Sequence, residues 1–170
     1  MYHRFNENDY PSTNIRMEVF NQQIQIIHQL DKFLYHKKTF WDNFLNKRDK
    51  LCFYLHGNVG VGKTMILNFF FNELRNKKLR LHFNEFMIKF HNYIFQNKDK
   101  ENGIDNFVKD LNTKAEILYF DEFQVTNIVD AMILGKLFKR IFEEKIKVIF
   151  TSNILINDLY KEGLQRDQFI

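Results

Sequence analysis

The first amphipathic segment of the chain lies near its N-terminus. Between Asn14 and Leu34, apolar residues recur at the spacing of one face of an α-helix. They are Ile15, Val19, Phe20, Ile24, Ile27, Leu30 and Leu34. The spacing predicts a leading helix, which a charged and aromatic stretch follows to about residue 50. We interpret residues 1–50 as a leading helical segment.

From residue 51 onward, short apolar runs alternate with amphipathic stretches. The apolar runs predict strands at residues 51–56, 79–84, 115–120 and 147–151. The amphipathic stretches predict helices over about 63–76, 86–94 and 133–142, and residues 97–106 read as a charged surface loop. Because strands that alternate with helices form parallel sheets covered on both faces, we expect residues 51–170 to form one α/β core.

The most specific motif follows the first predicted strand. It reads Gly57, Asn58, Val59, Gly60, Val61, Gly62, Lys63, Thr64 and fits the phosphate-loop pattern G-x-x-x-x-G-K-[ST] without a mismatch. Glycines let successive backbone N–H groups point at a phosphate, Lys63 supplies a mobile positive charge, and the Thr64 hydroxyl can ligate Mg²⁺. The helix predicted to begin near Lys63 adds the positive end of its dipole. The sequence therefore predicts a nucleoside-triphosphate site.

Two acidic residues directly follow the third predicted strand. A carboxylate at the C-terminal end of a parallel strand faces the crevice in which ligands bind, so Asp121 is placed to hold Mg²⁺ opposite Thr64. Glu122 can then polarise a water for attack on the γ-phosphate. The alternative is a pair of acids that flank the next helix. The phosphate loop favours the catalytic interpretation, and the adjacent glutamate favours hydrolysis over transfer to a bound substrate.

Two further polar residues are candidates for the same site. Asn153 follows the fourth predicted strand, where its amide can contact the γ-phosphate or the attacking water; the alternative is a turn-forming asparagine. Arg166 can stabilise the charge of a transition state in a neighbouring subunit. Bare chemistry favours a surface salt bridge for Arg166, with Asp167 or Glu162.

Composition and charge limit the remaining classes of function. The 170 residues are 45% hydrophobic, include one cysteine and carry a net charge of +4. There is no apolar run of transmembrane length and no signal-like leader, so we expect a cytoplasmic protein. Cys52 lies within a predicted strand and is interpreted as a small buried hydrophobe. The histidines lack ligand spacing, so we predict no zinc site.

The densest basic run covers residues 75–80. We interpret it as a solvated turn; the alternative is a nucleic-acid contact, which the modest net charge permits without demanding.

The order of these motifs resembles that of the AAA+ ATPases and, more narrowly, of the ZapE/Afg-type family. The resemblance rests on residues 57–64, 81–87, 119–128, 130–134, 151–153 and 158–166. Its most specific strings are Asp121-Glu122-Phe123-Gln124-Val125-Thr126 and Gly163-Leu164-Gln165-Arg166. The resemblance implies a P-loop sheet of AAA+ (ASCE) type sandwiched by helices, with ATP and Mg²⁺ as cofactors and nucleotide-dependent oligomers in which Arg166 acts in trans.

The same resemblance implies partners and a location. Bacterial members are linked to cell division through the FtsZ ring, and mitochondrial members to turnover of respiratory subunits. An FtsZ-like protein partner and a cytoplasmic protein, peripheral at the membrane in some members, follow as expectations from the family.

The chain departs from the family near its end. It stops at Ile170, before the fifth strand and the helical lid of AAA+ modules, and residues 154–157 lack the prolines usual there. In the usual strand order the missing strand pairs with the phosphate-loop strand, so its absence exposes an edge beside the site. We therefore expect a fragment that binds ATP and hydrolyses it poorly. Two alternatives are a DNA-associated ATPase resembling helicase loaders, and a nucleotide-binding module without turnover.

Overall fold

A computed structural model describes residues 13–35, 49–97, 102–125 and 128–159. The chain divides into two compact units, Met1–Arg48 and Asp49–Ile170. In the first unit, helix α1 covers Thr13–Tyr35, close to the predicted 14–34. No helix in the described ranges combines the length and the apolar character that a membrane crossing requires.

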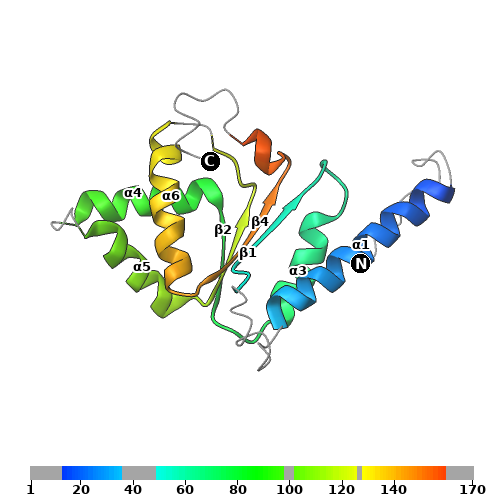
Figure 1. Ribbon diagram of the computed structural model, residues 1–170, viewed down its shortest axis with the longest axis horizontal. Helices are drawn as coiled ribbons and strands as arrows, with labels where there is room; N and C mark the ends of the chain where they lie inside the picture. Colours follow the sequence, from blue (N-terminus) through cyan, green and yellow to red (C-terminus); the bar gives the residue numbers. More distant parts are fainter. Residues whose placement is uncertain (1–12, 36–48, 98–101, 126–127, 160–170) are drawn as a thin grey trace. The chain divides into compact units, whose positions relative to one another are not determined.

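The second unit alternates strands and helices (Figure 1). Its strands are β1 (Cys52–His56), β2 (Lys78–His82), β3 (Ile117–Asp121) and β4 (Lys147–Ser152). Its helices are α3 (Lys63–Glu73), α4 (Phe83–Gln96), α5 (Gly103–Lys114) and α6 (Ile128–Glu143), and a short 3₁₀ turn, η2, covers Ile156–Asp158. All four predicted strands are present, with bounds within two residues of those expected.

The four strands form one parallel sheet in the order β1-β4-β3-β2. Cys52 pairs with Val148, and Ile117 pairs with both Lys147 and Lys78. Because the strands are parallel, their C-terminal ends meet at one edge of the sheet. The parallel α/β architecture predicted from the alternating pattern is confirmed.

Helices cover both faces of the sheet, with α4, α5 and α6 on one side and α3 on the other (Figure 1). The face toward α4–α6 holds a continuous aromatic core, in which the Phe120 and Phe150 rings stack at 5.5 Å between centroids. Leu137 and Ile141 of α6 are fully buried in that core. On the opposite face, the ring of Phe71 at the C-terminal end of α3 lies 6.1 Å from the ring of Tyr119. Strand β3 is buried along its whole length, so its last residue is held rigidly.

Two predictions about secondary structure and strand burial in this unit are wrong. Helix α5 begins at Gly103, inside the predicted surface loop 97–106, because an apolar face formed by Phe107, Val108 and Leu111 packs into the core. Cys52 is exposed instead of buried, because β1 is an edge strand among the described residues and Cys52 lies at its start.

Candidate nucleotide-binding site

The phosphate loop connects β1 to α3 at the C-terminal edge of the sheet. Its start is fixed to the neighbouring strand, since the Gly57 N–H donates to the Ser152 carbonyl at 3.2 Å. Gly60 and Gly62 have φ angles of 86° and 87°, which residues with a side chain rarely adopt. The positive φ of Gly62 explains why the pattern demands glycine there, and Gly60 meets the same backbone requirement at a position that the pattern leaves open. Gly62 leads the chain directly into the first turn of α3.

The Lys63 ammonium lies inside the curve of this loop. It donates to the carbonyls of Gly57 (2.5 Å) and Asn58 (2.9 Å) and to the side-chain oxygen of Asn153 (3.0 Å). Burial of the ammonium lowers the pKa of Lys63. Two of the predicted site residues, Lys63 and Asn153, are therefore in direct contact although 90 positions separate them.

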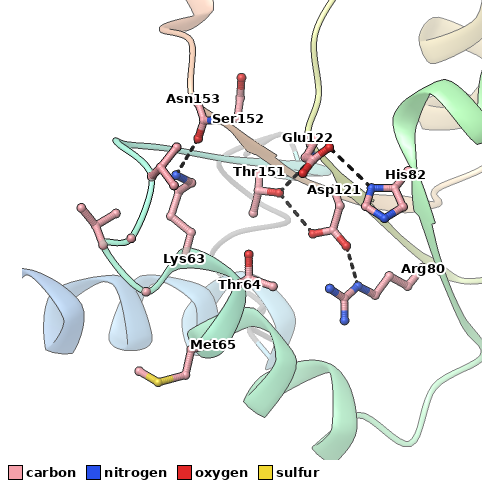
Figure 2. Close-up of a pocket in the computed structure, with 14 residues that line it drawn as sticks. Lys63, Thr64, Met65, Arg80, His82, Asp121, Glu122, Thr151, Ser152 and Asn153 are labelled. Carbon is pink, nitrogen blue, oxygen red and sulfur yellow. Dashed lines mark hydrogen bonds and ion pairs between the residues drawn. The ribbon is translucent and has the colours of Figure 1, made fainter. Parts of the chain in front are cut away.

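A pocket of about 390 Å³ opens in front of the loop (Figure 2). Its walls come from the loop and first turn of α3, the end of β2, and the residues that end or follow β3 and β4. They comprise residues 59–65, Arg80, His82, Asp121, Glu122, Thr151, Ser152 and Asn153. The fold thus gathers Lys63, Thr64, Asp121, Glu122 and Asn153 around one cavity.

Asp121 is the buried acid of this pocket, with only 5% of its surface exposed to solvent. Its Oδ2 accepts from Arg80 Nε at 2.6 Å, and its Oδ1 lies 3.4 Å from the Thr151 hydroxyl. A carboxylate can be buried at low cost only when charge and hydrogen bonds compensate it. Burial and the neighbouring Asp121 carboxylate also raise the pKa of the Tyr119 hydroxyl, so that this group stays neutral.

Glu122 differs sharply from its neighbour. Its side chain is 77% exposed at the pocket mouth, and its carboxylate lies 3.9 Å from His82 Nδ1. Its backbone has a φ of 56°, a conformation uncommon for residues other than glycine. The Glu122 N–H donates to the Thr151 hydroxyl at 3.3 Å, which helps to hold this conformation. The turn directs Asp121 toward Arg80 and Glu122 toward His82 at the exposed mouth of the pocket (Figure 2).

The pocket offers oxygen ligands that suit Mg²⁺. The Thr64 hydroxyl and the Asp121 carboxylate line the same cavity, and both are oxygen donors of the kind this ion prefers. Within the described ranges, no three His, Cys, Asp or Glu side chains gather as a metal cage. That donor set fits an ion that completes its coordination with phosphate oxygens and water, the usual arrangement for nucleotide-bound Mg²⁺.

Sequence reasoning missed five residues of the pocket: Met65, Arg80, His82, Thr151 and Ser152. The interpretation of residues 75–80 as a solvated turn is wrong for two of its cations. Arg80 points into the pocket, and Lys78 donates to the carbonyls of Leu74 (2.7 Å) and Phe71 at the end of α3. The alternation of Lys78, Arg80 and His82 along a strand was an available signal, since it puts the three side chains on one face. Arg166 lies outside the described residues.

Comparisons with protein families and with individual proteins agree with one another. Residues 5–170 match the AFG1-like ATPase family. The chain is 37% identical over 118 residues to the cell division protein ZapE of Escherichia coli K12, covering 69% of this chain and 32% of that protein. It is 38% identical over 130 residues to lactation elevated protein 1 homolog B of Danio rerio, covering 69% of this chain and 26% of that protein.

The chain thus spans about a third or less of the length of these curated relatives. Among solved structures, a crystal structure of DnaI is similar with a TM-score of 0.48 and 19% identity, covering 94% of this chain and 80% of that one.

Proposed function

The chain belongs to the AFG1-like ATPase family, and we propose that its pocket binds ATP with Mg²⁺ and hydrolyses the γ-phosphate. The observation that carries this proposal is the convergence of a phosphate loop, a buried aspartate, an exposed glutamate and an asparagine on one cavity. Their positions at the C-terminal ends of β1, β3 and β4 are those at which parallel sheets bind ligands.

In this mechanism the residues have separate tasks. The loop N–H groups and Lys63 bind the β- and γ-phosphates, and Thr64 with Asp121 would hold Mg²⁺. The ion, when bound, offsets the charge that develops on the phosphate oxygens. Asn153 is proposed to contact the γ-phosphate through its side-chain amide, and its contact with Lys63 supports this role.

Glu122 is the proposed general base. Its exposure at the pocket mouth leaves the carboxylate accessible to a water molecule, whereas the Asp121 carboxylate is buried and accepts hydrogen bonds from Arg80 and Thr151. The two adjacent acids therefore serve different purposes, because one is buried and paired and the other is exposed. Arg166 is proposed, from the family resemblance, to act on a neighbouring subunit's nucleotide.

The direct test compares turnover and nucleotide binding in two variants of the 170-residue chain. We expect Lys63→Ala to abolish nucleotide binding, with Lys109→Ala, an exposed lysine of α5, as its matched control. Glu122→Gln should keep binding while lowering steady-state turnover by about a hundredfold or more. Equal loss of binding in Lys63→Ala and Glu122→Gln would refute the role given to Glu122.

The physiological role is a separate proposal. One relative's name is that of a cell division protein, and we propose a comparable coupling of ATP turnover to a protein partner, with an FtsZ-like protein as the first candidate. The DNA-associated alternative loses support because Lys78 and Arg80 make internal contacts. Stimulation of turnover by DNA, weakening as salt rises, would restore that alternative.

A further inference from the structure

The planar guanidinium group of Arg80 contacts three neighbouring side chains. Its Nε donates to Asp121 Oδ2 at 2.6 Å, and its Nη1 donates to Asn68 Oδ1 at 2.5 Å. Its guanidinium carbon lies 4.9 Å from the centroid of the Tyr119 ring. The sheet register explains this reach, because Arg80 pairs with Tyr119 and Asp121 lies two residues further along β3 on the same face.

Asn68 connects this arginine to the phosphate loop. It lies four residues after Thr64 on α3, so the two side chains share one face of that helix. Arg80 therefore bridges the helix that carries Thr64 and the strand that carries Asp121. Figure 2 shows its contact with Asp121. These are the two residues to which the proposed function assigns Mg²⁺.

We propose that Arg80 is a positioning residue, which fixes the Asp121 carboxylate relative to Thr64 and thereby sets how tightly the chain takes up a divalent cation with a nucleoside triphosphate. This inference rests on the proposed function. Arg80 occupies Asp121 Oδ2, while Oδ1 faces the Thr151 hydroxyl, so the carboxylate has one defined orientation. Groups that orient metal ligands in this way influence metal affinity as the ligands themselves do.

A lysine at this position could not perform the same task. The contacts to Asp121 and Asn68 use two different nitrogens of a rigid fork, whereas an ammonium places all its donors on one atom. Arg80→Lys therefore keeps the positive charge beside Asp121 and removes the bridge. Asn68→Ala removes the bridge from the other end and leaves the Arg80–Asp121 pair in place.

The experiment measures binding of a fluorescent ATP analogue as Mg²⁺ is titrated, and again in EDTA, with thermal unfolding as a check on folding. We expect Arg80→Lys to raise the half-saturating Mg²⁺ concentration about tenfold or more, and Asn68→Ala to raise it by less. Binding in EDTA should not change, because the phosphate loop is untouched. Arg140→Lys is the matched control, since Arg140 pairs with Asp105 and Glu144 outside the pocket.

Three results would overturn the proposal. The first is a half-saturating Mg²⁺ concentration that is unchanged in both variants, and the second is a lower one, which would make Arg80 a competitor of the ion. The third is an equal loss of binding with and without Mg²⁺. If Arg80→Lys does not fold, Asn68→Ala alone decides between these outcomes. Failure of the proposed function is distinguishable, because the unsubstituted chain would then bind no nucleotide in either condition.

Discussion

The Thr151 hydroxyl connects the two acids of the site. It lies 3.4 Å from Asp121 Oδ1, accepts the Glu122 N–H at 3.3 Å, and is 3.5 Å from the Phe120 carbonyl. Thr151 is 4% exposed, so these contacts form where water competes little. One buried hydroxyl on β4 thus helps to orient the buried acid and to hold the unusual backbone of the exposed one.

We expect Thr151→Val to lower turnover more than it lowers nucleotide binding. Valine keeps the shape of threonine but leaves the Glu122 N–H without this acceptor, at a cost in stability of about 1–3 kcal/mol. Thr151→Ser restores the hydroxyl and should recover most of the turnover. Turnover assays with thermal unfolding on both variants check this, and equal activity of the two variants would contradict it.

The site residues differ in how well the sequence predicts their place in the site. The loop residues, including Lys63, were predictable because their motif is contiguous and its geometry is local. The alternation along β2 indicates only that Arg80 shares a face with its neighbours. The contacts of Arg80 and Thr151 with Asp121 were not predictable, because they depend on which strands lie beside β3, and strand order is a long-range property. Once β2 and β4 are known to flank β3, Arg80 and Thr151 can be placed on either side of Asp121.

Among the elements, the strands were easier to predict than the helices. The buried apolar runs of β3 and β4 are unambiguous, whereas α5 begins within a segment whose charge and glycine indicated a loop. Its apolar face recurs at Ile104, Phe107, Val108 and Leu111, the i, i+3, i+4, i+7 spacing of a helix, so the signal was present. Gly103 marks the first residue of this helix.

Two glycine-to-alanine substitutions should have opposite effects on stability. Gly135 lies on the exposed face of α6 with no atom within 4 Å of an added Cβ, so Gly135→Ala should stabilise by about 1 kcal/mol. Gly60 also has free space, but its φ of 86° makes Gly60→Ala unfavourable by about 1–2 kcal/mol. Urea unfolding of both variants measures the difference, and shifts of the same sign would show that backbone conformation does not decide the outcome.

For the whole molecule, the remaining question is whether two chains complete one site. The family resemblance implies that Arg166 acts on a neighbouring subunit, and ring-like assemblies join such heterologous surfaces head to tail. The described residues provide the loop and both acids from a single chain. A trans-acting arginine would therefore leave nucleotide binding within one chain and make hydrolysis a property of the assembly.

Mixing two inactive variants tests this arrangement. Glu122→Gln keeps Arg166, and Arg166→Ala keeps Glu122, so each variant alone should turn over little ATP. In an equimolar mixture that assembles at random, roughly a quarter of the sites should contain both an intact Glu122 and an intact Arg166. Turnover should recover to a matching extent. A mixture no more active than the average of its two components would show that Arg166 does not act in trans.

The strand order also determines when, during synthesis, the nucleotide site can form. Among the described strands, β1 pairs only with β4, and β4 is the last of them to leave the ribosome. The Gly57 N–H and the Lys63 ammonium must wait for Ser152 and Asn153 before their contacts can close. A nascent chain arrested within α6 would carry the whole phosphate-loop motif without the strand that supports it, so we expect the proposed ATP binding only after β4 has joined the sheet.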